Sequence, residues 1–205
     1  MLNYSVGIDV SSQKLDVAIC VIDEQQKVTV RASKSSIPNT LSGFKLLKNW
    51  IEKHHKTQSL PLVICMEATG VYYEHCALFL YQQGYSVSVI LPNKAKKYLQ
   101  SLGLKSKNDS IDSKGLAQMG AEQNLKKWQP MGEFFYKLRS LTRQNQSLQE
   151  LKAGVSNQIH ALEHGMYVEK TVLKQLKKTI TLIDKQLGEL EKAIVDTLKT
   201  KEEVF

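Results

Sequence analysis

The sequence contains no apolar run that approaches the roughly 20 residues needed to span a bilayer. Its N-terminus lacks a basic segment followed by an apolar core, which is the pattern of a secretory signal. It has only three cysteines, Cys20, Cys65 and Cys76, which lie in apolar surroundings without Cys-x-x-Cys spacing. We therefore expect buried, reduced thiols in a cytoplasmic protein and exclude a membrane-embedded or disulfide-bonded secreted one.

The composition is that of a folded protein with a surplus of positive charge. Apolar residues make up 42% of the 205 residues and charged residues 23%. This length holds one ordinary domain with an extension, or two small domains. The net charge of +8 predicts a polyanionic partner, although charge alone indicates nothing about the fold.

The first predicted structure is a β-hairpin with a carboxylate inside its first strand. Residues 1–19 alternate apolar and polar side chains and are interrupted at Ser11-Ser12-Gln13-Lys14. Asp9 lies among Val6, Ile8 and Val10, a pattern typical of a central, buried strand. Because an unpaired charge is costly there, Asp9 must meet a cation or several hydrogen bonds.

The following hundred residues predict a mixed α/β domain. A helix start at Asn39-Thr40 precedes an apolar face at Leu41, Phe44, Leu47 and Ile51. Three antiparallel strands come first and parallel strands afterwards, in the order β-β-β-α-β-α-β, which is that of a ribonuclease-H-like domain. The remaining predicted strands are 27–32, 60–66 and 85–91, and the remaining helices are 72–83 and about 109–123.

Four carboxylates on separate predicted elements have a reason to converge. Asp9 lies in the first strand, Glu67 ends the fourth, and Asp109 and Asp112 share one face of a helix start. Magnesium prefers such hard oxygen ligands, and two divalent ions can activate a water and stabilise the leaving oxygen of a phosphodiester. Taken alone, the two helix-start aspartates are simply residues favoured in a first turn, and Glu67 ends a strand. Together, in this order, the four acids predict a metal site for nucleic-acid chemistry.

Lysines gather next to these acids in the sequence. Opposite-sign charge beside an acidic metal site favours contact with a phosphate backbone, although a solvated face is an equally good interpretation on charge alone. The predicted nucleic-acid-binding lysines are Lys94, Lys96, Lys97, Lys105, Lys107 and Lys114.

After Pro130 the pattern changes to that of a coiled coil. Apolar residues follow a 3-4 spacing from Leu138 to Met166, and the spacing restarts from Leu173 to Ile194. A break near Gly165 predicts two antiparallel helices, each about 40 to 50 Å long. The domains are therefore predicted as 1–130 and 131–205. Polar residues at core positions, Asn145 and Lys152, would set register or oligomer state.

Other residues of chemical interest have simpler interpretations. His160 and His164 are four residues apart but lack a third ligand and the zincin order, so we interpret them as surface or turn residues. Ser11 and Ser12 follow a strand without a histidine to activate them, which favours a role in the turn. The lysines at 170–178 are expected to be solubilising flanks of the coiled coil.

Three short motifs in this order resemble the acidic motifs of IS110-family transposases. The resemblance covers residues 6–117, and the coiled coil after it also resembles that of the family. One departure is Ser113, where the family commonly has alanine. The motifs are Gly7-Ile8-Asp9-Val10-Ser11, Met66-Glu67-Ala68-Thr69-Gly70 and Lys107-Asn108-Asp109-Ser110-Ile111-Asp112.

The resemblance implies a RuvC-like domain whose D-E-D-D tetrad, Asp9, Glu67, Asp109 and Asp112, binds Mg²⁺ or Mn²⁺. It implies a prokaryotic, nucleoid-associated DNA recombinase that moves an insertion element with a structured guide RNA, acting on element ends and target DNA. It also implies a homodimer or homotetramer built through the coiled coil. A C-terminal domain with a catalytic serine, typical of the family, has no counterpart here, so we expect nucleic-acid and metal binding without complete recombination.

Three alternatives stay open at this point. A RuvC-type nuclease that resolves Holliday junctions would use the same acids, although the long coiled coil counts against it. A non-catalytic module for nucleic-acid binding and oligomerisation would tolerate neutral residues at Asp9 and Glu67. An actin-like sugar kinase would need a second glycine-rich phosphate loop, which the sequence lacks. The sequence also leaves open whether the acids cleave DNA or position it, and whether the helices pair within or between chains.

Overall fold

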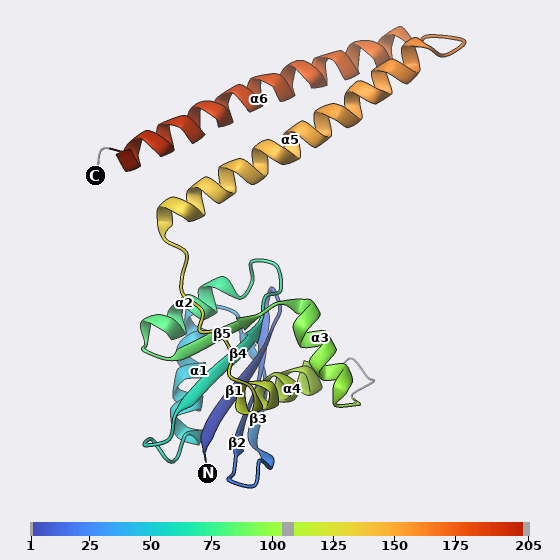
Figure 1. The fold of residues 1–205 in the computed structure, drawn as a ribbon. Coiled ribbons are helices and arrows are strands. Elements are labelled where there is room, and N and C mark those ends of the chain that lie inside the picture. The colour runs from blue at the N-terminus through green and yellow to red at the C-terminus, as the bar shows by residue number, and fades with distance from the viewer. Residues whose placement is uncertain (1, 104–108, 203–205) are drawn as a thin grey trace. The chain divides into compact units, whose positions relative to one another are not determined.

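A computed structural model describes the backbone of residues 2–103 and 109–202 and the side chains of residues 2–103 and 112–200. The chain divides into two compact units, Met1–Pro130 and Met131–Phe205 (Figure 1). The first is an α/β unit and the second is a helical hairpin. No helix within the described part of the chain is long and apolar enough to cross a membrane.

A five-stranded mixed sheet forms the centre of the first unit. Its strand order is β3-β2-β1-β4-β5, so β1 is the middle strand. The pairs β3–β2 and β2–β1 are antiparallel, whereas β1–β4 and β4–β5 are parallel. This topology confirms the predicted ribonuclease-H-like fold. The strands are β1 Asn3–Val10, β2 Lys14–Ile22, β3 Val28–Pro38, β4 Leu62–Glu67 and β5 Ser86–Ile90.

Helices α1 (Leu41–His54) and α2 (Glu74–Gln82) cover one face of the sheet (Figure 1). The Thr40 side chain caps α1 by accepting a hydrogen bond from the Gly43 N–H at 3.3 Å, as the sequence predicts for a threonine at a helix start. Apolar residues of both helices pack on the alternate apolar residues of β1 and β2 in one large core. Burial of this face makes β1 a rigid central strand.

Helix α4 (Asp109–Glu122) covers the opposite face of β1, β2 and β4 (Figure 1). Its backbone lies unusually close to the sheet because the strand carries a glycine at the crossing point. A Cβ atom on Gly7 would collide with the Ser113 carbonyl oxygen and the Ala117 backbone nitrogen. Only glycine permits this approach, so Gly7, two residues before Asp9, has a role in packing.

Three details of the sequence interpretation were wrong. Leu41, assigned to the apolar face of α1, is 60% exposed because it occupies the first position of the helix. Strand β3 extends to Pro38, whereas the predicted strand ended at residue 32. Of its last residues only Ile37 is buried, and the others lie at an exposed sheet edge. Helix α3 (Pro92–Ser101) was missed because Pro92, interpreted as a strand terminator, begins the helix at a position that needs no backbone N–H.

The second unit is a hairpin of α5 (Glu133–Glu163) and α6 (Lys170–Glu202), which pair within one chain (Figure 1). Its turn includes Gly165, as predicted. The fully buried apolar core is small, and half-buried apolar residues of both helices pack against it. The four buried core residues are Leu148, Val155, Ile183 and Leu187.

The predicted core positions of the hairpin are correct in its middle and wrong at its tip. Met166, assigned to the apolar seam, is 88% exposed because α5 ends at Glu163. Lys152 is half-buried, and its ammonium lies 2.6 Å from the Asp184 carboxylate of α6, so this polar position links the two helices at one register. Asn145 accepts a hydrogen bond from Gln149 on its own helix at 2.8 Å.

Candidate metal centre

Asp9 and Glu67 are brought together by the register of two parallel strands. The pairing of β1 with β4 runs from Tyr4 opposite Leu62 to Ile8 opposite Met66. Asp9 and Glu67 are the next residue in each strand, at the carboxyl end of the parallel pair. Paired residues of neighbouring strands project from the same face of a sheet, so the two carboxylates share one face. Both are half-buried.

The face that carries both carboxylates is the one covered by α4. Odd-numbered residues further along β1 contact residues nearer the start of α4. The Asn3 amide donates to the Ala121 carbonyl at 3.5 Å, Ser5 lies against Gly120, and Gly7 lies against Ala117 and Ser113. Asp9, two residues after Gly7 on the same face, is therefore directed toward the first turn of α4, where Asp112 lies.

The structure thus sets Asp9 beside Glu67 on the face that α4 covers. Asp112 is half-buried in the first turn of this helix. Asp109 begins α4, and its side chain lies outside the described residues. Among the side chains that the structure describes, no group of three carboxylates, histidines or cysteines is gathered as a preformed metal site.

The donor set nevertheless fits a hard divalent cation. All the candidate ligands are carboxylates, which are the ligands that Mg²⁺ prefers. Magnesium keeps several waters and needs only one or two protein carboxylates in its first contact layer, so a closed protein cage is unnecessary. The N-terminal end of α4 carries partial positive charge, which favours the ionised form of nearby carboxylates.

Sequence reasoning missed a fifth carboxylate beside Asp9. Asp16 lies opposite Asp9 in the antiparallel pairing of β1 with β2 and is 3% exposed. Its carboxylate lies 3.2 Å from the Lys14 ammonium and accepts a hydrogen bond from the Ser36 N–H at 3.0 Å. Lys14 and Asp16 are two residues apart in a strand, so their shared face was the signal that could have revealed the pair. Asp16 is thereby held by protein groups next to the candidate site.

The predicted nucleic-acid-binding lysines that the structure describes are exposed. Lys94, Lys96 and Lys97 belong to α3, and Lys114 belongs to α4. Lys105 and Lys107 lie outside the described residues. Burial raises the pKa of the Cys65 thiol to about 12, and the Lys94 charge acts against this rise. Ala95, next to Lys94 in α3, packs in one cluster with Cys65 of β4 and Leu116 of α4, so α3 lies on the α4 side of the strand that ends in Glu67.

The cysteines have no chemical role at this site. All three are buried free thiols, and burial raises the pKa of each to about 12. Thiols with such a pKa are protonated and unreactive at neutral pH, which confirms the expectation of inert cysteines. Ser11 is also structural, because its hydroxyl donates to the Lys14 carbonyl at 2.9 Å and accepts from the Lys14 N–H at 3.1 Å in the hairpin turn.

The two histidines of the hairpin lie at its tip, as predicted. The rings of His160 and His164 stack with their centroids 4.2 Å apart. The Nδ1 atom of His164 lies 2.8 Å from the His160 carbonyl oxygen. Both side chains are exposed. Their geometry is that of a helix end, in the unit that does not contain the carboxylates.

Comparison with known proteins gives one family match. A family model described as a transposase, of the IS110 DEDD type, matches residues 6–167. Two curated proteins, each named pilin gene-inverting protein, from Moraxella bovis and Moraxella lacunata, are both 29% identical over 188 residues. The match covers 90% of this chain and 55% of each relative, so the chain spans about half of their length.

Several solved structures resemble the α/β unit at low sequence identity. Thermus thermophilus RuvC is 13% identical with a TM-score of 0.45, and the match covers 61% of this chain and 99% of that one. The fowlpox virus resolvase in complex with Holliday junction DNA is 14% identical with a TM-score of 0.36, over 55% of this chain and 94% of that one. The fold itself follows from the strand order and pairing of this chain.

Proposed function

Because the chain belongs to the IS110 DEDD transposase family, we propose that its Met1–Pro130 unit is the metal-dependent catalytic module of a DNA recombinase. The observation that carries the proposal is the register of β1 and β4, which sets Asp9 beside Glu67 on the face covered by α4. Carboxyl ends of parallel strands are the usual place for chemistry in open α/β sheets.

The proposed metal ligands are Asp9, Glu67, Asp109 and Asp112, with Mg²⁺ or Mn²⁺ as the ion. When bound there, the metal would supply Lewis-acid activation of a water or hydroxyl and stabilise the leaving oxygen of a phosphodiester. Asp9 and Glu67 contribute ionised oxygens on strands that cannot shift, because their other face is packed into the main core. Asp112 is positioned independently by α4, whose distance from β1 is set by Gly7.

The lysines of α3 and α4 are proposed to hold the phosphate backbone of the substrate. Lys94, Lys96, Lys97 and Lys114 are exposed, and α3 lies on the side of the sheet that carries the acids. Lysine contacts phosphate as a compact point charge and does not depend on base sequence. We include Lys105 and Lys107 in this set on their place in the sequence between α3 and α4.

The remaining parts of the proposal follow the family. The DNA substrates are the ends of a mobile element and its target, a structured guide RNA is a partner, and the Met131–Phe205 hairpin joins copies into a dimer or tetramer. Exposed apolar side chains on both helices, including Leu151 and Leu182, support assembly through the hairpin. The first test uses metal binding, because the chain spans about half the length of its curated relatives.

The test is a titration of Mg²⁺ and Mn²⁺ into the wild-type chain and into Asp9→Asn and Glu67→Gln, read by calorimetry. Both variants are expected to lose metal binding, because each removes a charged ligand of nearly the same shape. Melting followed by tryptophan fluorescence gives a second measurement, since both tryptophans, Trp50 and Trp128, lie in the α/β unit. Saturating metal should raise the wild-type melting temperature and leave the Asp9→Asn value unchanged.

The matched control is Asp196→Asn, the same substitution at an exposed position of α6. It should bind metal as the wild type does. Equal metal binding by the wild type, Asp9→Asn and Glu67→Gln would contradict the proposal and return the acids to cap and surface roles.

A further inference from the structure

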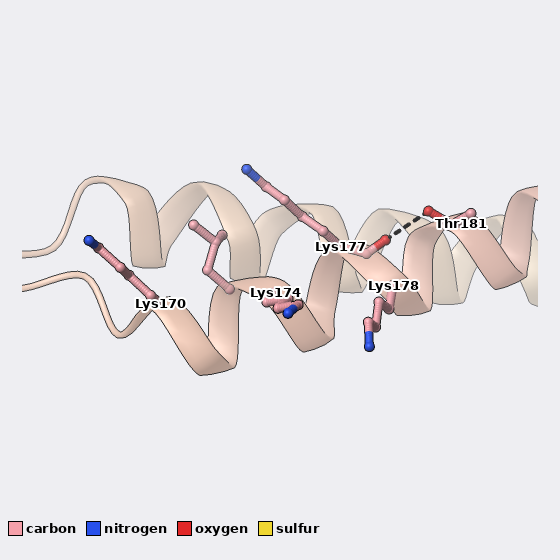
Figure 2. A pocket seen from close by; sticks show the side chains of 6 residues that line it. Lys170, Lys174, Lys177, Lys178 and Thr181 are labelled. Carbon is pink, nitrogen blue, oxygen red and sulfur yellow. Dashed lines mark hydrogen bonds between the residues drawn. The ribbon is translucent and has the colours of Figure 1, made fainter.

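The first half of α6 carries positive charge that the helix does not balance. Lys170, Lys174, Lys177 and Lys178 lie within its first nine residues, and the first acid of the helix is Asp184 (Figure 2). The second half of α6 alternates acids and lysines. Solubilising helix faces usually mix both signs, as this second half does. The segregation of charge toward the hairpin tip therefore needs a separate explanation.

Three of these lysines form an exposed stripe, which we call the α6 lysine stripe: Lys170, Lys174 and Lys178. They are four residues apart, so they follow one another along one side of the helix at steps of about 6 Å. None of the three takes part in an ion pair with any residue that the structure describes. Three like charges on one face repel one another, which favours a negatively charged partner.

Lys177 differs from the stripe because it has a partner within the hairpin. Its ammonium lies 2.8 Å from the Glu163 carboxylate of α5, and Figure 2 shows its side chain directed away from that of Lys178. The Lys177 ammonium also lowers the pKa of Glu163, as a close opposite charge does. Two acids lie near the tip: Glu163 pairs with Lys177, and the Glu169 carboxylate accepts a hydrogen bond from the Thr171 N–H at 2.9 Å. Neither forms an ion pair with a lysine of the stripe among the residues that the structure describes.

The surface around the stripe is open and shallow. The four lysines, with Leu173 and Thr181, line an open depression of about 450 Å³ on α6 (Figure 2). The Thr181 hydroxyl donates to the Lys177 carbonyl at 3.1 Å, so it does not fill the depression. The first turn of α6 contains no acid, and the Glu169 carboxylate just before the helix accepts a hydrogen bond from the Thr171 N–H. A bound anion would relieve the mutual repulsion of the lysines.

We propose that the α6 lysine stripe is a second nucleic-acid-binding surface, which contacts the phosphate backbone of DNA or RNA without reading its sequence. Repeated lysines suit a repeated phosphate better than a single small anion, and such contacts depend on charge rather than base identity. The inference rests on the proposed function only in taking nucleic acid as the partner. It assigns a contact to the Met131–Phe205 hairpin, for which only assembly was proposed.

The test compares two triple variants of the full chain. The stripe variant is Lys170→Gln, Lys174→Gln and Lys178→Gln, and the control is Lys185→Gln, Lys192→Gln and Lys199→Gln on the second half of the same helix. Both remove three positive charges, and glutamine retains nearly the helix propensity of lysine. Far-UV circular dichroism checks that both keep their helices.

Affinity is measured for labelled duplex DNA and for a labelled structured RNA at several salt concentrations. The stripe variant should bind at least about tenfold more weakly at low salt, and its slope of log affinity against log salt should be smaller by about 2. The control should change both quantities much less. A loss on DNA alone, on RNA alone or on both supports the inference and identifies the ligand.

Two results would overturn the inference. One is an equal effect of the two triple variants on slope and affinity, which would indicate net charge rather than a site. The other is nucleic-acid binding by the stripe variant that equals that of the wild type in affinity and salt dependence. The metal titration separates this failure from failure of the proposed function, because the stripe variant should bind Mg²⁺ like the wild type whichever result is found.

Discussion

The two units of this protein differ in how much apolar surface they bury. In the α/β unit, α1 and α2 pack on one face of the sheet and α4 on the other, and large residues such as Ile8, Leu47 and Leu80 are fully buried. In the hairpin, two helices, each of more than thirty residues, bury four apolar side chains among those that the structure describes. Layered packing produces a rigid scaffold, whereas a helix pair leaves most of its surface exposed.

This difference matches the roles proposed for the units. A catalytic site needs carboxylates on elements that do not shift, and β1 and β4 meet that requirement because they are central strands. A binding and assembly element needs accessible surface, and the hairpin offers both exposed apolar residues and unbalanced lysines. The following predictions test whether the two units differ as strongly in energy as they do in packing.

The largest expected contrast comes from the same truncation in each core. Leu47→Ala in α1 should destabilise the α/β unit by about 4 kcal/mol, because the residue is fully buried in a layer that cannot collapse around a cavity. Leu187→Ala in α6 should cost about 2 kcal/mol, because this residue is 9% exposed and has fewer neighbours to lose. Urea unfolding followed by tryptophan fluorescence reports the first, and far-UV circular dichroism reports the second. Equal losses would remove the distinction between the cores.

The next contrast uses one glycine in each unit. Gly7→Ala should destabilise the α/β unit by about 3 kcal/mol, because the added Cβ would meet the backbone of α4, which can give way only by moving the whole helix. Gly188→Ala should stabilise the hairpin by about 1 kcal/mol, because open space surrounds this position of α6 and alanine favours helix. Thermal melting by the same two probes measures both. A harmless Gly7→Ala would indicate that α4 does not lie against β1 as described.

The thiols of the α/β unit should change its stability least near neutral pH and increasingly at higher pH. Burial raises the pKa of Cys20, Cys65 and Cys76 from 9.0 to about 12. Between these values the folded unit keeps protons that the unfolded chain releases, so its stability should fall as pH rises from about 9 toward 12. Urea midpoints measured by tryptophan fluorescence at pH 8 and pH 10 test this. The fall should be smaller in Cys76→Ala, and an identical fall would assign the effect to other groups.

Much of the fold was accessible from sequence because strong local patterns agree with it. Alternation located β1 and β2, a nearly continuous apolar run located β4, and Thr40 marked the start of α1. Those signals are local, so they can be recognised without knowledge of the contacts made by the rest of the chain. Helix α3 was not predicted because Pro92 was interpreted as a strand terminator, and the end of β3 was not predicted because Ile37 is its only buried residue after residue 32.

The chain by itself determined which carboxylates are available and on which elements they lie, since the residue types and the strand and helix patterns are properties of the sequence. The tertiary structure alone decided that Asp9 stands beside Glu67 and opposite Asp16, because strand register depends on pairing between distant segments. It also decided that α4 lies against β1 at Gly7, because that contact depends on the close approach permitted by glycine. Register and packing distance result from the whole core, and no local stretch of sequence contains them.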